Sequence, residues 1–214
     1  MDDKDIKTRI LNGAGGLFAK YGFRSVSMDD IAHNLGISKK TIYQHFTDKD
    51  QIVNLAVAHH LADAKAQLQE ISEFAADAID FLIKANQRLM LSLRETTSGL
   101  MLDLRKYHRA AWKQVEDFRK SFLFQLLLRN IRQGTREGLF RDDVNAEVLA
   151  RLRLEEATMT LDPEIFPRQT FDRTVVSQVI LDHFVAGIST DAGMQLYQQY
   201  KANLTKENSL NTIL

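Results

Sequence analysis

The sequence predicts an all-α protein, and three observations lead to that fold class. Only two prolines and ten glycines interrupt the 214 residues, so few positions break a helix. Long stretches are rich in Ala, Leu, Gln, Glu, Lys and Arg, which have high helix propensities. Apolar residues recur at spacings of three and four, the period of one helix face. We therefore expect about nine or ten helices.

The first helix is expected over residues 5–21, where an apolar stripe ends just before Gly22. Glycine readily adopts the backbone conformation that ends a helix. The stripe consists of Ile6, Ile10, Ala14, Leu17, Phe18 and Tyr21. We expect it to share a small core with the two helices that follow.

Residues 27–46 predict two short helices held at a fixed angle. Ser27 and Asp30 have the spacing of a capping box, and Gly36 can end the first helix in the left-handed conformation. Ser38 then caps the second helix. A capped helix, a glycine turn and a second capped helix are typical of a helix-turn-helix.

The second short helix has an inward column and an exposed face. Ile42 and Phe46 lie four residues apart and are expected to face the core. The other faces carry cations, hydroxyls, an amide and an imidazole, which suit phosphates and base edges. These residues are Lys39, Lys40, Thr41, Tyr43, Gln44 and His45. The alternative interpretation is a solvated helix face that contacts no partner.

The rest of the chain also has the helical period. A fourth helix is expected to begin with Thr47 and Asp50, a second capping-box spacing, and to continue past His59 and His60. Asn145 is expected to cap a later helix. The further helices are expected at about residues 72–95, 100–106, 109–137, 146–161 and 170–187, with one more segment from Met194 to Tyr200.

Composition disfavours several classes of function. Lys and Arg (28) balance Asp and Glu (28), and the sequence has no cysteine, which excludes disulfides and thiolate metal sites. His59 and His60 are adjacent, so on a helix they point about 100° apart and cannot grip one ion together. Neither a catalytic constellation nor a phosphate-binding loop occurs in the sequence. We predict no catalytic residue, no metal, no cofactor, no membrane association and a cytoplasmic location.

Two runs within residues 5–60, LFAKYGFRSVSMDDIA and LGISKKTIYQHFTDKDQIV, resemble the TetR family of transcriptional regulators. The resemblance implies an N-terminal three-helix helix-turn-helix DNA-binding domain over residues 1–46. It also implies a helical effector-binding and dimerisation domain over residues 47–214. Beyond residue 60 the resemblance consists only of helix pattern and length.

The resemblance also implies which residues contact double-stranded DNA. Because Asp29 and Asp30 would repel phosphate, either Ser27 or the backbone amide of Met28 is expected to touch the DNA backbone. Carried over position by position, the implied DNA-binding residues are Ser27, Met28, Lys39, Lys40, Thr41, Tyr43, Gln44, His45 and Lys49.

A homodimer is expected, because two recognition helices must have a fixed separation to meet two half-sites. The expected interface is formed by the helices at 146–161 and 170–187. Its apolar candidates are Leu149, Leu152, Val176, Val179, Ile180 and Phe184. The alternative role of these side chains is the core of a single chain.

A small-molecule effector of unknown identity is expected between the helices at 72–95 and 109–137. The aromatic and methionine side chains that could line its cavity are Phe81, Met90, Met101, Tyr107, Trp112 and Phe122. Their alternative role is ordinary core packing. The polar candidates within such a pocket are His59, His60, Asn86, Arg88 and His108.

The sequence thus favours a ligand-responsive transcriptional regulator, by hypothesis a repressor, that binds a palindromic operator as a homodimer. One alternative is a helical ligand-binding or protein-interaction module with a vestigial helix-turn-helix, and another is an all-α enzyme. A vestigial unit needs to keep only its core. The regulator is therefore favoured by the polar residues retained outside that core, which are Lys39, Lys40, Thr41, Tyr43 and Lys49.

Overall fold

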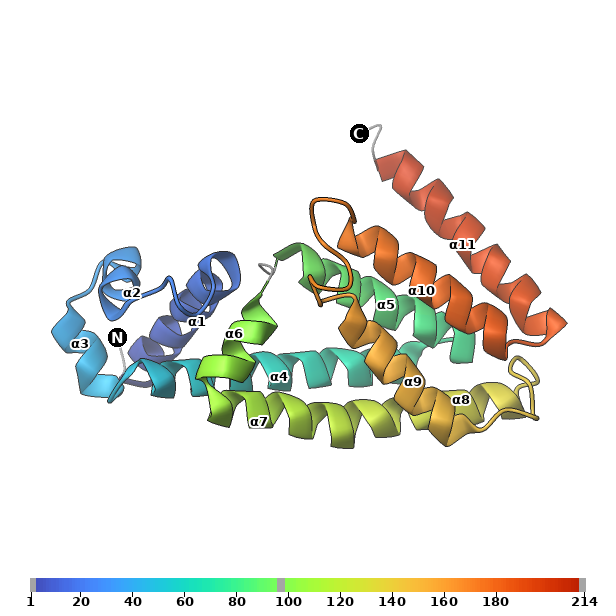
Figure 1. Cartoon of the computed structure of the whole chain (residues 1–214), viewed down its shortest axis with the longest axis horizontal. Helices are drawn as coiled ribbons and strands as arrows, with labels where there is room; N and C mark the ends of the chain where they lie inside the picture. Colours follow the sequence, from blue (N-terminus) through green and yellow to red (C-terminus); the bar gives the residue numbers. More distant parts are fainter. Residues whose placement is uncertain (1–2, 96–98, 212–214) are drawn as a thin grey trace.

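The computed structural model describes residues 3–95 and 99–211, and over these residues it is built from helices (Figure 1). The elements are α1 Asp3–Tyr21, α2 Met28–Leu35, α3 Lys39–His45, α4 Lys49–Phe74, α5 Ala78–Glu95, α6 Leu100–Tyr107, α7 Arg109–Asp117, the π-helix η1 Phe118–Leu123, α8 Phe124–Arg136, α9 Ala146–Met159, α10 Arg173–Ile188 and α11 Asp191–Asn211. The segments α7, η1 and α8 follow one another without a break. The predicted all-α fold class is confirmed.

Two hydrophobic cores lie at opposite ends of α4. The N-terminal core contains buried side chains of α1, α2, α3 and the start of α4. The C-terminal core contains buried side chains of α5, α8, α9, α10 and α11. With 26 residues, α4 is about 39 Å long, and Figure 1 shows it running from the α1–α3 end into the larger helical bundle. It therefore connects the two cores as one continuous helix.

Several predicted helix boundaries were wrong. The helix expected from residue 170 begins at Arg173, and the segment expected from Met194 to Tyr200 extends over Asp191–Asn211. The N-cap of α4 is Asp48, whose side chain accepts a hydrogen bond from the amide of Gln51, so the cap lies one residue after the predicted Thr47. Residues 72–74 continue α4 instead of opening the next helix. The next helix, α5, starts at Ala78. The side chain of Asp77, just before it, accepts hydrogen bonds from the amides of two α5 residues.

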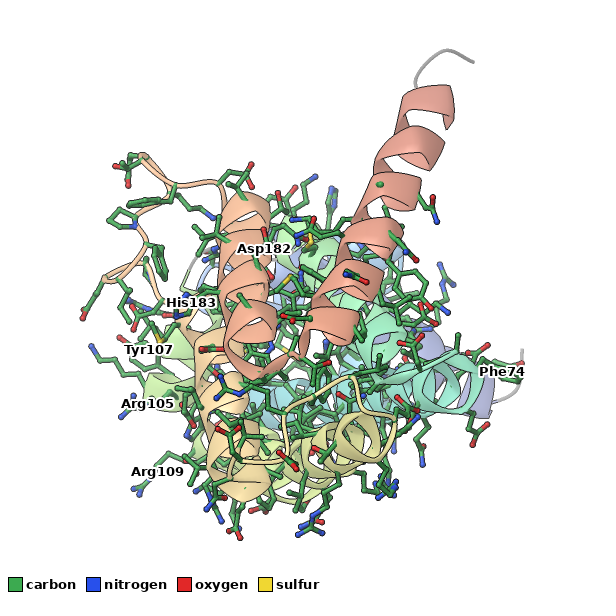
Figure 2. All side chains as sticks on the ribbon, turned by 90° about the vertical axis from the view of Figure 1, so that its right-hand side faces the viewer. Phe74, Arg105, Tyr107, Arg109, Asp182 and His183 are labelled. Atoms are coloured by element: carbon green, nitrogen blue, oxygen red, sulfur yellow. The ribbon has the colours of Figure 1, made fainter. Side chains whose placement is uncertain are left out.

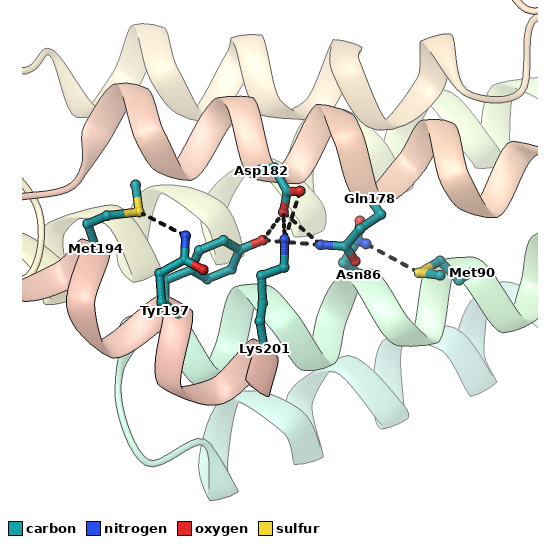
Figure 3. Close-up of polar contacts among 8 residues, drawn as sticks. Asn86, Met90, Gln178, Asp182, Met194, Tyr197 and Lys201 are labelled. Atoms are coloured by element: carbon teal, nitrogen blue, oxygen red, sulfur yellow. Dashed lines mark hydrogen bonds and ion pairs between the residues drawn. The ribbon is translucent and has the colours of Figure 1, made fainter. Parts of the chain in front are cut away.

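A polar network holds α11 against α10 (Figure 3). The carboxylate of Asp182 accepts hydrogen bonds from Tyr197 Oη at 2.6 Å, Lys201 Nζ at 2.8 Å and Gln178 Nε2 at 2.9 Å. Although desolvation opposes the effect, these donors lower the pKa of Asp182. The C-terminal helix is therefore attached by charge-assisted hydrogen bonds as well as by apolar contacts.

A second polar network is buried among α5, α9 and α10. Asn86 Oδ1 accepts hydrogen bonds from Arg153 Nη2 at 3.1 Å and from Ser177 Oγ at 2.9 Å. Arg153 Nη1 also lies 3.6 Å from Glu156 Oε2. Desolvation lowers the pKa of Arg153 and raises the pKa of Glu156. Three helices thus meet around one arginine that is almost completely buried.

The side chains expected to line an effector cavity are divided between the two cores. Phe81 is buried in the C-terminal core, whereas Trp112 packs against the N-terminal one. Tyr107 is exposed, and Arg24 stacks on its ring. Phe81 thus packs in the core, and it also lines a groove between α4, α5 and α8.

The five polar pocket candidates, His60 included, all take part in interactions of this structure. Asn86 belongs to the Arg153 network described above. Three others form the pairs His59–Asp63, Arg88–Gln67 and His108–Asp50.

Candidate nucleic-acid interface

Helix α2 is fixed at both ends by local hydrogen bonds. Ser27 Oγ accepts a hydrogen bond from the amide of Asp30 at 3.2 Å, and the amide of Ser27 donates to Asp30 Oδ2 at 2.7 Å, which completes the predicted capping box. The hydrogen bonds with Ser27 lower the pKa of Asp30. Gly36 has a φ of 63°, the left-handed conformation predicted for the end of this helix.

Helix α3 is held from beneath and presents its outer face to solvent. Ser38 caps it by accepting a hydrogen bond from the amide of Thr41 at 3.0 Å. Ile42 and Phe46 are buried in the N-terminal core, as the spacing predicts. Lys40, Tyr43 and Gln44 are exposed. Among the described residues, neither Lys40 nor Gln44 has an ion-pair or hydrogen-bond partner.

An ion pair that the sequence analysis did not find joins α2 to α3. Lys39 Nζ lies 2.9 Å from Asp29 Oδ2, and both side chains are largely exposed. The hydrogen bond with Asp29 raises the pKa of Lys39. Lys39 can therefore reach a phosphate only by sharing or leaving Asp29. The local charge balance on this face is less positive than the lysines alone suggest.

Met28 and Lys49 point inward. The Met28 side chain is buried in the N-terminal core, so only its backbone amide remains to meet a phosphate. Lys49 Nζ donates a hydrogen bond to the carbonyl oxygen of Phe23, and desolvation lowers the pKa of Lys49. The lysine thus ties the start of α4 to the turn between α1 and α2.

The junction of α6 and α7 packs directly on this helix-turn-helix unit. His108 Nδ1 lies 2.8 Å from Asp50 Oδ1, and the ring centroid of His108 lies 5.4 Å from that of Phe23. Leu104 and Ala111, on either side of His108, are buried in the N-terminal core. His108 therefore contacts both the first turn of α4 and the aromatic core under α2.

Neither a membrane-spanning helix nor a metal-binding cluster is found among the described residues. None of their helices combines the length and apolar character that a bilayer crossing requires. Within the same residues, no group of three His, Asp or Glu side chains is placed to hold a metal ion.

Comparisons with known proteins agree with this geometry. Residues 10–56 match the family described as "Bacterial regulatory proteins, tetR family". The chain is 30% identical over 157 residues to the HTH-type transcriptional repressor AcnR of Corynebacterium jeikeium, covering 68% of this chain and 74% of AcnR. It is 28% identical over 187 residues to the uncharacterized HTH-type transcriptional regulator YvaF of Bacillus subtilis, and this match covers 86% of this chain and 95% of YvaF.

A solved regulator structure from Saccharomonospora viridis, in complex with choline, has a TM-score of 0.74 at 23% identity and covers 88% of this chain and 100% of its own. This structural similarity shows the fold alone. Membership of the family is shown by the sequence identity to AcnR. The chain belongs to the TetR family of transcriptional regulators.

Proposed function

We propose that this regulator is a ligand-responsive repressor that binds a palindromic operator as a homodimer. The observation that carries the proposal is the α3 surface, where a helix locked by Ile42 and Phe46 turns Lys40, Tyr43 and Gln44 outward. In this proposal residues 1–46 form the DNA-binding domain and residues 47–214 the regulatory domain. A relative named as a repressor supports the sign of regulation.

The expected DNA contacts divide by chemistry. Gln44 has an amide that can pair with a base edge, whereas Lys40 and Tyr43 suit phosphates. Ser27, the amide of Met28, Thr41 and His45 are proposed to contact the flanking backbone. Lys39 and Lys49 are also proposed to contact phosphates. To do so, Lys39 would leave Asp29, and Lys49 would leave the carbonyl oxygen of Phe23. For Lys49, the first turn of α4 also favours an anion.

Replacing Gln44 by alanine is expected to reduce discrimination between operator and random DNA. A lost bidentate base contact costs about 1–3 kcal/mol for the preferred sequence and little for others. The measurement is a gel shift with DNA flanking the coding region, repeated with random DNA of equal length. The matched control is Lys40→Ala, on the same exposed face, which should weaken both complexes alike. If Gln44→Ala weakened both DNAs equally, the base-reading role would be wrong.

An exposed apolar face on α9 and α10 supports the dimer. Val148, Leu152, Val175 and Val179 are 57%, 48%, 60% and 59% exposed. Leu152 and Val179 are among the residues that the sequence predicts for the interface, and we add Val148 and Val175 to the proposed face because of their exposure. Val176 and Phe184, also predicted, are buried in the chain's own core, which was the alternative for them. Two such faces related by a two-fold axis would form a four-helix interface.

Coupling between effector and operator is proposed to run through α4 and through His108. An effector in the regulatory domain that tilts α4 would change the separation of the two α3 helices, at about 1–3 kcal/mol of coupling. The S. viridis neighbour in complex with choline supports small-molecule binding in this fold. His108 gives the α6–α7 junction a direct contact with the first turn of α4.

Replacing His108 by alanine is expected to loosen the DNA-binding unit selectively. The substitution removes the Asp50 contact and the ring packed near Phe23, so amide hydrogen exchange should speed up in α1–α4 but not in α9 and α10. The matched control is His59→Ala, which breaks the exposed His59–Asp63 pair and should change neither region. A uniform change across the chain would contradict a local linking role for His108.

A further inference from the structure

A groove of about 490 Å³ lies between the C-terminal end of α4, the start of α5 and α8. It lies next to Phe74, the last residue of α4, which projects from the molecule in Figure 2. Three of its lining residues are Arg129, Arg132 and Arg136. Their spacing of three and four places them on one face of α8. The groove is therefore lined along one side by guanidinium groups.

These three arginines have no partner among the described residues: none forms an ion pair or hydrogen bond there. By contrast, Arg119 and Arg151 each pair with a carboxylate. Like charges one helical turn apart repel each other. Their donors thus remain available to an external anion, which guanidinium groups bind with two parallel hydrogen bonds.

The neighbouring carboxylates form no ion pair with these arginines among the described residues. Asp77, in the groove wall, accepts hydrogen bonds from two α5 amides and from Tyr200 Oη at 2.6 Å. Glu137 accepts from the amide of Ala78 at 3.0 Å and from Gln133 Nε2 at 2.7 Å. Glu73 also lines the groove, but no ion pair joins it to an arginine in the described part of the chain. Asp77 and Glu137 keep their negative charges, but no carboxylate in the described part of the chain occupies the donors of the three arginines.

Asn130 supplies an independent observation. It lines the groove, and only 5% of its surface is exposed. Its Nδ2 donates a hydrogen bond to the carbonyl oxygen of Ala78 at 3.0 Å. Its Oδ1 is buried and has no hydrogen-bond partner. An unsatisfied buried acceptor is costly. Because this oxygen has almost no accessible surface, a ligand's hydroxyl donor would satisfy it by displacing the side chains that cover it.

We propose that this groove binds a small hydroxylated anion, with its carboxylate or phosphate on Arg129, Arg132 and Arg136 and a hydroxyl donating to Asn130. The anion site itself is independent of the proposed function. Only the identification of this anion as the effector rests on that function. Binding would join α8 to the end of α4, the helix whose first turn carries Asp48 and Lys49 beside α3.

The test is calorimetric titration of the full chain without DNA. Malate and glycerol 3-phosphate represent the two anion sources, and succinate and propyl phosphate are their counterparts without an alcohol hydroxyl. At least one hydroxylated probe should bind about tenfold or more tightly than its counterpart. The double variant Arg132→Gln/Arg136→Gln should weaken that binding by about tenfold or more. The matched control Arg141→Gln alters an exposed arginine paired with Asp143 and should leave it unchanged.

Absence of binding by all four probes up to about 10 mM, far weaker than ordinary effector affinities, would overturn the proposal. So would equal binding by the double variant and the control. Because DNA is absent from the titration, these results leave the proposed operator binding intact. Conversely, failure of the gel shift would overturn the proposed function without altering the titration.

Discussion

The variant Val179→Glu is expected to sediment as a monomer and to lose operator affinity by at least about 100-fold. Val179 is largely exposed on α10, so a glutamate there leaves the single chain's core intact. At a two-fold interface it would place unpaired carboxylates in an apolar contact, which is strongly unfavourable. A monomer carries one recognition helix, and losing the second connected site typically removes a factor of about 10²–10⁴ in avidity.

The matched control is Phe74→Glu, which introduces the same charge at another exposed apolar position. Phe74 and His183, which lies one turn beyond Val179 on α10, are on opposite sides of the view in Figure 2. The control variant should remain dimeric in sedimentation velocity and keep its operator affinity. A Val179→Glu protein that stayed dimeric would place the interface on another surface.

The variant Arg153→Met is expected to lower the free energy of unfolding by about 3–5 kcal/mol at neutral pH. It leaves Glu156 buried without its cation and removes a donor to Asn86. The measurement is urea unfolding followed by circular dichroism. The double variant Arg153→Met/Glu156→Gln should recover most of the loss, because a neutral amide replaces the unpaired charge. The control Arg151→Met breaks an exposed pair with Glu147 and should cost at most about 1 kcal/mol.

The loss in Arg153→Met should also depend on pH. Desolvation raises the pKa of Glu156 in the folded protein, so folding becomes less favourable as pH rises from the unfolded pKa through the folded one. Removing Arg153 raises the folded pKa further. The destabilisation should therefore be largest at neutral pH and shrink as acidification protonates Glu156. An equal loss at all pH values would exclude the unpaired carboxylate as its cause.

The sequence predicts the features of this fold that depend on neighbouring residues. Ser27, Gly36, Ser38 and Asn145 have the cap or turn roles expected of them, because each acts on backbone groups within a few positions. The α4–α5 boundary was missed because the helical pattern continues through residues 72–74. The start of α5 is instead fixed by Asp77.

Features that depend on distant residues were not predictable in this way. Asp29 meets Lys39, and Asp50 meets His108, across 10 and 58 positions. The inward orientation of Lys49 likewise depends on a carbonyl group 26 residues away. Dimer candidates divide into buried and exposed sets because both sides of α10 are apolar, and only packing decides which side faces the core. The DNA contacts themselves stay predictions.

The π-helix η1 has a geometric consequence for the continuous rod from Arg109 to Arg136. A π-helical turn takes up about one residue more than an α-helical turn, and one residue corresponds to about 100° of rotation. The phase of α8 relative to α7 thus differs from that of an uninterrupted α-helix. His108, just before the first residue of this rod, contacts Asp50 in the DNA-binding unit. Arg129, Arg132 and Arg136, near the other end, line the groove. The angle between these two directions is therefore set by a single extra residue.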